Sequence, residues 1–203
     1  KRDNLIITMK ALIKPKQLYS RDCVLSKPNP VPLKSGVYAW YFRQVPLGVS
    51  NDDCHIHDGM LLFYVGISPR KPTKDGKASS ENLRKRIRKH FKTNASTSTL
   101  RMSLGCLLQK SLGITLRRIG RTERFMFLPQ DEIKLSNWMG KNAMVCWSEH
   151  AEPWKLEDEM IKNFSLPLNL LGNEQHPFYP KLFAIRKQAY QKARQLPVTV
   201  VSN

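Results

Sequence analysis

One acidic side chain falls on the apolar face of an expected helix. The segment 153–164 has helical spacing. Its apolar positions are Leu156, Met160, Ile161 and Phe164. Glu157 stands three and four positions before Met160 and Ile161, which places its carboxylate within this face. A carboxylate there needs a metal ion, another cation or converging hydrogen-bond donors. The alternative is an edge carboxylate that reaches solvent or pairs with a structural arginine.

Two basic side chains share one face of a second expected helix, at 81–92. Its apolar residues recur at every fourth position, as Leu83, Ile87 and Phe91. Arg86 and His90 each precede a residue of this stripe and lie about 100° around the helix from it. An arginine donates two hydrogen bonds to one phosphate, and a histidine transfers a proton near neutral pH. The alternative is a solvated arginine and a boundary histidine.

Two tyrosines lie on expected strands that bracket a polar loop at 43–60. The segments 36–42 and 61–67 are rich in aromatic and β-branched residues, which indicates buried strands. In an antiparallel hairpin Tyr38 and Tyr64 share a face, and Gly66 allows a ligand or another backbone to approach closely. Buried strand tyrosines are also ordinary core residues, and this alternative stays open.

The other segments complete the expected architecture. We predict a helix at 99–112, a short strand at 124–128, a turn or half-helix at 136–140, a third buried strand at 143–147 and a last helix at 180–195. The expected fold is α+β, with a small central three-stranded sheet, antiparallel or mixed, flanked by helices. We expect an N-terminal leader at 1–34 with an extended Pro-rich approach, a central domain at 35–170 with an insertion at about 99–141, and a C-terminal helical extension at 171–203.

The charge of the chain favours a polyanionic partner. The 203 residues carry 34 Lys and Arg against 16 Asp and Glu, a net charge of +18. Nucleic acid is the commonest partner of such a chain. An acidic membrane surface and a merely solubilising charge are the alternatives, but no strongly apolar amphipathic helix is evident. No apolar run approaches the roughly 18 residues of a membrane span, and no secretory signal is visible.

The basic residues fall into three clusters that could form one face. Within the first, the expected nucleic-acid contacts are Arg70, Lys71, Lys74, Lys77, Arg84 and Lys89. The second cluster is Arg117, Arg118, Arg121 and Arg124. The third is Lys181, Arg186, Lys187, Lys192 and Arg194. We expect the loop that carries Arg70 to contact phosphates of the nucleic-acid backbone.

Metal-binding patterns based on cysteine are absent from the sequence. Cys23, Cys54, Cys106 and Cys146 are widely spaced, which favours reduced thiols in a cytoplasmic protein. Cys54, His55 and His57 could ligate zinc, yet no fourth ligand has a convincing spacing, so a polar loop is the preferred interpretation.

Read together, the motifs form an ordered set. In chain order they are Gly36-Val37-Tyr38, Tyr64-Val65-Gly66, the segment from Leu83 to Phe91, Leu156-Glu157 and Pro167-Leu168-Asn169. This set resembles that of the GIY-YIG nuclease superfamily over about residues 35–170. Valine replaces isoleucine in both tyrosine motifs. The chain departs from the pattern in the two polar loops and in the insertion at 99–141, which puts the choice of substrate in doubt.

The resemblance implies a divalent-metal-dependent endonuclease that hydrolyses phosphodiester bonds in DNA. Carried over by position, Glu157 would hold one Mg²⁺ or Mn²⁺, and Tyr64 or Tyr38 would help to activate the attacking water. Arg86 would contact the phosphate, His90 would orient or transfer a proton, and Asn169 would support the site. The alternative is a non-catalytic or partner-dependent nucleic-acid binding module on the same fold. RNA is a possible substrate, no membrane partner is expected, and the oligomeric state stays open.

Overall fold

A four-stranded antiparallel sheet forms the centre of the molecule. The structure, a computed structural model, describes residues 2–72, 79–92, 94–120 and 124–199. The strands of the central sheet are β1 (Gly36–Phe42), β2 (Ile56–His57), β3 (Met60–Ser68) and β6 (Ala143–Glu149). Their order is β2-β3-β1-β6, and every neighbouring pair is antiparallel. The α+β class is therefore confirmed, but the prediction of a three-stranded sheet missed β2.

The added strand follows from a tight turn. Asp58 and Gly59 both have positive φ, at 48° and 70°, and they join His57 of β2 to its partner Met60 of β3. Two such residues form the turn that matches the twist of a hairpin. With only two residues, β2 is too short to show the alternation that marks a strand in a sequence.

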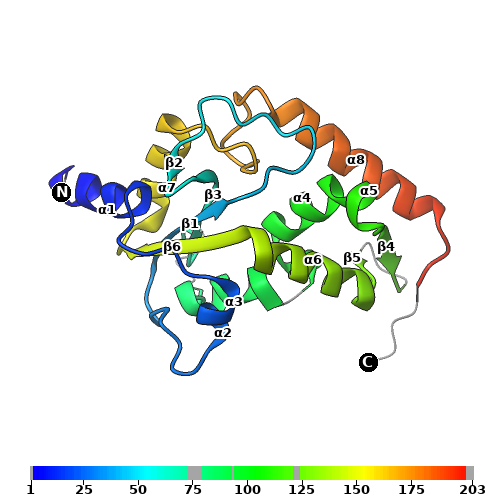
Figure 1. Cartoon of the computed structure of the whole chain (residues 1–203), viewed down its shortest axis with the longest axis horizontal. Coiled ribbons are helices and arrows are strands. Elements are labelled where there is room, and N and C mark those ends of the chain that lie inside the picture. The colour runs from blue at the N-terminus through cyan, green and yellow to red at the C-terminus, as the bar shows by residue number, and fades with distance from the viewer. Residues whose placement is uncertain (1, 73–78, 93, 121–123, 200–203) are drawn as a thin grey trace.

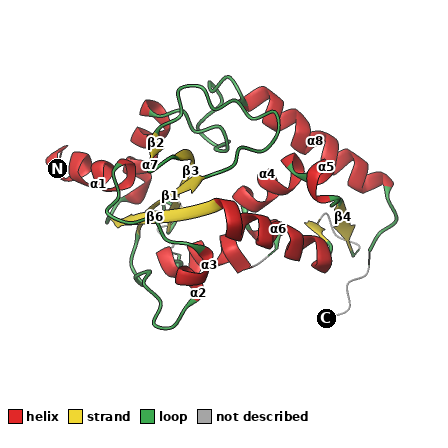
Figure 2. Cartoon of the chain, viewed as in Figure 1, coloured by secondary structure: helices red, strands yellow, loops and turns green. Residues whose placement is uncertain are grey.

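Helices cover both faces of the sheet, as Figure 2 shows. On β1, Val37, Ala39 and Tyr41 join one core with Leu12 of α1 (Arg2–Ile13) and with α7 (Pro153–Asn163). The alternate residues Tyr38, Trp40 and Phe42 join a second core with α3 (Leu83–Lys92). Period-two alternation thus sends β1 side chains into two layers of core. The helix α3 begins two residues after the predicted start, because the Asn82 side chain caps it by accepting from Lys85 N at 3.0 Å.

The segment from Asn94 to Asn142 builds a second layer beyond α3. It contains the short 3₁₀ turn Ala95–Thr97, α4 (Thr99–Leu107), α5 (Gln109–Leu112), β4 (Leu116–Ile119), β5 (Arg124–Phe127) and α6 (Pro129–Asn142). The antiparallel pair β4-β5 and the C-terminal helix α8 (Tyr179–Gln195) gather with these helices at one end of the molecule, and α1 lies at the other end (Figure 1).

Two predictions for this layer need correction, and one strand was missed. The expected helix at 99–112 is two helices that meet at Leu108, and the strand β4 was missed. The expected turn or half-helix at 136–140 is part of the longer helix α6, which starts at Pro129 because proline suits the first turn of a helix. Glu132 of α6 forms an ion pair with the fully buried Arg101 of α4, at 2.5 Å, and this pair joins the two helices.

The N-terminal segment contains helices where an extended approach was expected. Besides α1 it forms α2 (Arg21–Leu25), and Tyr19 pairs with Val145 of β6 through both backbone hydrogen bonds. His55 Nε2 and His57 Nε2 lie 2.6 and 3.1 Å from the carbonyl oxygens of Ile13 and Pro15. These histidines hold the chain after α1, and His57 belongs to strand β2 where a polar loop was expected.

Two further sequence predictions concern the cysteines and membrane-spanning helices. The four cysteines all lie within the described residues and are free thiols, as expected. Among the described residues, no helix combines the length and the apolarity needed to cross a membrane.

Candidate catalytic site

A glycine sets the position of the first tyrosine. Tyr38 of β1 pairs in register with Gly66 of β3, and its ring lies across the glycine backbone. A Cβ on residue 66 would stand 2.5 Å from the Tyr38 hydroxyl oxygen and 2.7 Å from Cζ. The close approach that the sequence suggested at Gly66 is therefore made by the Tyr38 ring.

We expect Gly66→Ala to displace the Tyr38 ring and to lower the free energy of unfolding by about 1–3 kcal/mol, as overpacking does. Denaturant titration measures this loss. A double-mutant cycle gives the control, because removal of the ring in Tyr38→Ala removes the clash and should make the alanine at position 66 nearly neutral. An equal loss in both backgrounds would contradict the assignment.

The Tyr38 hydroxyl is held by a chain of hydrogen bonds from α3. His90 Nε2 lies 2.9 Å from it, and Arg86 Nε donates to it at 3.4 Å. On the other side of the imidazole, His90 Nδ1 lies 2.7 Å from Ser98 Oγ. Ser98 caps α4 and accepts from Arg101 N at 3.1 Å. In neutral imidazole one ring nitrogen donates and the other accepts, so His90 links the Ser98 hydroxyl to the Tyr38 hydroxyl.

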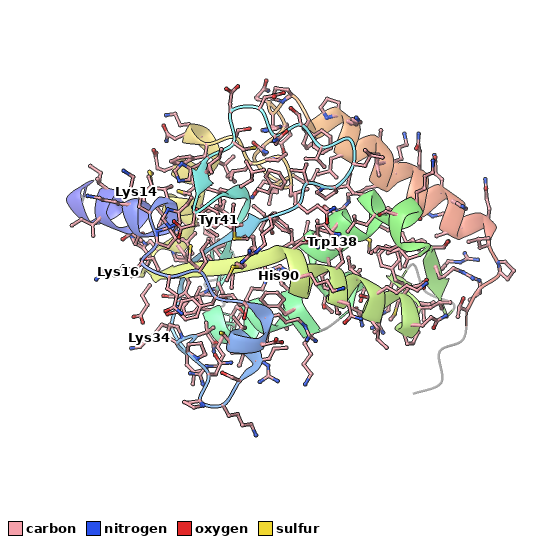
Figure 3. All side chains as sticks on the ribbon, viewed as in Figure 1. Lys14, Lys16, Lys34, Tyr41, His90 and Trp138 are labelled. Carbon is pink, nitrogen blue, oxygen red and sulfur yellow. The ribbon has the colours of Figure 1, made fainter. Side chains whose placement is uncertain are left out.

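Burial and the neighbouring arginines determine the protonation states of His90 and Tyr38. His90 is fully buried in the interior, near the middle of the view in Figure 3. Burial, together with Arg86 and Arg101, lowers its pKa well below the usual value, so the imidazole is neutral. Burial raises the pKa of Tyr38 to about 12, while Arg86 acts in the opposite direction. Arg86 is thus the group that most favours a phenolate at Tyr38.

Regular alternation places the second tyrosine on the same face as Tyr38, because Tyr38 pairs with Gly66 and Trp40 pairs with Tyr64, and a bulge follows at Phe63. Trp40 pairs with Tyr64 while Tyr41 pairs with Leu62, so Phe63 is one extra residue on β3. Tyr64 is buried beside Tyr38, and among the described residues its hydroxyl has no hydrogen-bond partner. Burial raises its pKa, Tyr38 and Glu157 raise it further, and Arg86 lowers it.

Glu157 extends from α7 toward the two tyrosines. The neighbouring Leu156 and Met160 are fully buried and fix α7 on the sheet, while Glu157 itself is half-buried. Burial raises the pKa of Glu157 to about 7, Asp158 adds to this effect, and Arg70 and Arg86 oppose it. Within the described residues, no donor bonds to its carboxylate and no cation forms an ion pair with it.

This carboxylate fits a hard divalent cation. Carboxylate oxygen is the ligand that Mg²⁺ prefers, and Mg²⁺ usually keeps several waters beside one or two carboxylates. No group of three or more His, Cys, Asp or Glu side chains with metal-site geometry occurs in the described ranges. Glu157 would hold such a cation, with water and substrate as the further ligands.

Asn169 supports the backbone behind the tyrosines. Its side-chain oxygen accepts from Val65 N and its side-chain amide donates to Val65 O, both at 2.9 Å. These bonds pair the backbone N–H and C=O of Val65, next to Tyr64, where β2 no longer pairs with β3. The buried Asn169 thus holds the strand that carries Tyr64.

A basic cleft of about 660 Å³ opens beside this group. Its lining includes Arg70, Arg86, Arg124 and Arg186, together with the residues 95–99 that lead into α4. The two distant arginines belong to the second and third basic clusters of the sequence, which therefore meet the first in space. Sequence reasoning had noted their charge but did not place them at the site, and it missed Ser98.

The other predicted nucleic-acid contacts have different positions. Lys71 is exposed next to Arg70, whereas Lys74 and Lys77 lie outside the described residues. Arg84 donates from Nε to the carbonyl oxygen of Val31 at 2.6 Å, and Lys89 forms an ion pair with Glu81 at 2.9 Å. These two α3 side chains have structural partners in the protein, and the cleft does not include them.

Comparison with known proteins gives one result. A family model described as the GIY-YIG catalytic domain matches residues 36–188, which are most of the chain. No curated protein and no solved structure gives a significant match. The matched range contains every residue of the candidate site.

Proposed function

The chain belongs to the GIY-YIG catalytic domain family, and from this premise we propose that it is a divalent-metal-dependent endonuclease that hydrolyses phosphodiester bonds in DNA. The observation that carries the proposal is the Glu157 carboxylate, which has no ion-pair partner among the described residues and acts electrostatically on the two tyrosines, together with Arg86 in the adjacent basic cleft. In phosphodiester hydrolysis a carboxylate can hold a metal ion, a fixed guanidinium can stabilise the charge on the phosphate, and hydroxyls can orient the attacking water.

Each side chain has a distinct role in this proposal. Arg86 is oriented by its bonds to Tyr38 and to the Thr97 carbonyl oxygen, and it presents its charge to the scissile phosphate. The Tyr38 and Tyr64 hydroxyls orient the attacking water and help to remove its proton. Neutral His90 holds Tyr38 in place, and Asn169 holds the strand of Tyr64.

The metal ion would be held by Glu157. When bound, Mg²⁺ or Mn²⁺ supplies positive charge to the phosphate and to the leaving oxygen. Burial raises the pKa of Glu157 to about 7 although Arg70 and Arg86 oppose this effect, so near neutral pH a cation competes there with a proton. The free thiols of the chain favour a reducing compartment, and we propose the cytoplasm.

Incubation of the purified protein with nucleic acids tests the proposed activity. Supercoiled plasmid, single-stranded DNA and matched RNA are each incubated with Mg²⁺, with Mn²⁺ or with excess chelator. We expect nicking or cleavage of DNA with a divalent cation and none with chelator. Binding without cleavage under every metal condition would support the alternative of a non-catalytic binding module.

We expect the loop after β3 to contribute to binding through phosphate contacts. Replacement of Arg70, Lys71, Lys74 and Lys77 by glutamine should lower the slope of log affinity against log salt by a few units, because each lost phosphate contact removes about 0.9 unit. Binding isotherms in chelator at several salt concentrations measure the slope.

A matched variant controls for the loss of net charge. Lys10, Lys14, Lys16 and Lys34 are exposed residues of the N-terminal segment, and the last three are labelled toward the left of Figure 3. Replacement of these four by glutamine should change the slope much less, since they lie away from the cleft. Equal slopes for the two variants would show that the loop contributes only general charge.

A further inference from the structure

An apolar groove runs along α8, beyond the candidate catalytic cleft. Its volume is about 670 Å³, and its walls include Phe125, Tyr179, Phe183 and Tyr190. The exposed Leu171 forms part of the opposite wall. Because the groove combines four aromatic rings with the basic side chains of Arg186, Lys187 and Arg194, it suits a ligand with flat apolar faces and negative charge.

The aromatic rings are presented in pairs. Tyr179 and Phe183 stack with centroids 6.0 Å apart and an interplanar angle of 19°. Phe125 and Tyr190 meet edge to face at 4.9 Å, with Arg194 over the Phe125 ring at 5.2 Å. Phe183 keeps 52% of its surface exposed, which leaves a ring face accessible to a ligand.

The helix behind these rings carries a charge of one sign. The 17 residues of α8 include Lys181, Arg186, Lys187, Lys192 and Arg194 but no Asp or Glu. Among the described residues that line the groove, the one acidic side chain is Glu174, and it accepts from Gly172 N at 3.1 Å. The groove therefore combines stacking surfaces with a positive rim.

The groove continues from the catalytic cleft. Phe125, Arg186 and Tyr190 line both hollows. Arg186 is fixed at the junction, because its NH1 donates to Ser103 Oγ of α4 at 2.8 Å. A strand bound with its scissile phosphate at Arg86 can thus pass Arg186 and enter the groove.

We propose that this groove binds unpaired nucleotides of the substrate strand, with bases stacked on Phe183 and Tyr179 and phosphates against Arg186 and Lys187. The inference rests on the proposed function for the position of the scissile phosphate. Base pairs within a duplex hide their faces, so the aromatic rings select single-stranded segments over paired ones. An apolar peptide or a second copy would fit the rings but would leave the positive rim unmatched.

Binding of tailed and blunt duplexes tests the proposal. Fluorescence anisotropy in excess chelator compares wild-type protein with a blunt DNA duplex and with the same duplex carrying an unpaired tail at either end. The tail should tighten binding about tenfold, within the range measured for base stacking on aromatic residues. Phe183→Ala should remove this gain and leave affinity for the blunt duplex unchanged.

Matched variants separate stacking from the loss of an exposed apolar side chain. Phe183→Tyr keeps the ring and should keep the tail effect, whereas Phe183→Leu should lose it. Ile133→Ala, at a similarly exposed position on α6, should behave as wild type. A tail containing iodouracil should crosslink on irradiation to the peptide with Tyr179 and Phe183, which reports the site directly.

Three results would overturn the inference. The first is a tail effect on affinity that survives Phe183→Ala. The second is a loss of affinity in Phe183→Ala that is equal for blunt and tailed duplexes. The third is a change of oligomeric state in Phe183→Ala, measured by sedimentation, which would make the groove a protein interface. Cleavage assays with Mg²⁺ distinguish the two proposals. If the tail effect depends on Phe183 but no DNA is cleaved, the nuclease proposal is rejected and the groove proposal is kept. If the tailed duplex is cleaved equally well by wild type and by Phe183→Ala, the nuclease proposal is kept and the groove proposal is rejected.

Discussion

Glu157→Gln is expected to abolish cleavage in Mg²⁺ or Mn²⁺ while the protein stays folded. The amide preserves the volume of the side chain but removes the negative charge that holds a hard cation. Because the wild-type carboxylate lacks an ion-pair partner among the described residues, its replacement breaks no structural salt bridge. Cleavage rates at saturating DNA, with melting temperatures of both proteins, measure the effect.

A second glutamate on the same helix provides the control for this prediction. Glu159 lies two residues further on α7 and is half-buried like Glu157, and Glu159→Gln is the same chemical change. It should leave the rate near that of wild type. Mg²⁺ should raise the melting temperature of wild type and of Glu159→Gln but not of Glu157→Gln, because a cation that binds the folded state stabilises it. Wild-type cleavage in excess chelator, or full activity of Glu157→Gln, would reject the metal assignment.

Tyr38→Phe and Tyr64→Phe should each lower the cleavage rate by on the order of 100-fold or more, with DNA binding retained. Each change keeps the ring and removes one hydroxyl. At Tyr38 that hydroxyl is hydrogen-bonded to His90 and accepts from Arg86, so its loss also removes one hydrogen bond from each of these two side chains. At Tyr64 the hydroxyl has no hydrogen-bond partner among the described residues, which leaves it available to water or substrate.

Tyr41 gives a matched control from the same strand. Its hydroxyl donates to the carbonyl oxygen of Leu12 at 2.8 Å on the opposite face of the sheet. Tyr41→Phe should cost about 1 kcal/mol of stability through the lost hydrogen bond and leave the rate unchanged. Single-turnover rates at saturating metal and DNA make the comparison. Normal turnover in Tyr38→Phe and Tyr64→Phe would leave the binding-module alternative as the better account of the chain.

Strong periodicity made most of the elements predictable. The strands β1, β3 and β6 and the helices α3, α7 and α8 lie close to their expected ranges, since each buries a continuous apolar stripe or run. The elements that were missed carry weaker local signals. The strand β4 spans four residues and includes Arg117 and Arg118, so its pattern does not distinguish a strand from a basic loop.

Periodicity also made part of the candidate site predictable from the sequence. Glu157, Arg86 and His90 were singled out because their spacing relates each of them to an apolar stripe on its own helix. Their order along the chain, with the two tyrosine motifs, indicated the family that the comparison then showed. The local sequence does not indicate how close these residues lie to one another, because β1, β3, α3 and α7 meet only through long-range packing.

The sequence by itself therefore determined the chemical groups, their elements and the positive charge, because composition, motif order and periodicity are properties of the chain. Only the tertiary structure decided which groups meet. It set Tyr38 across Gly66, placed His90 between Tyr38 and Ser98, and brought Arg124 and Arg186 to one cleft. These contacts join residues far apart in the chain, and their geometry depends on the packing of whole helices against the sheet, which no local pattern encodes.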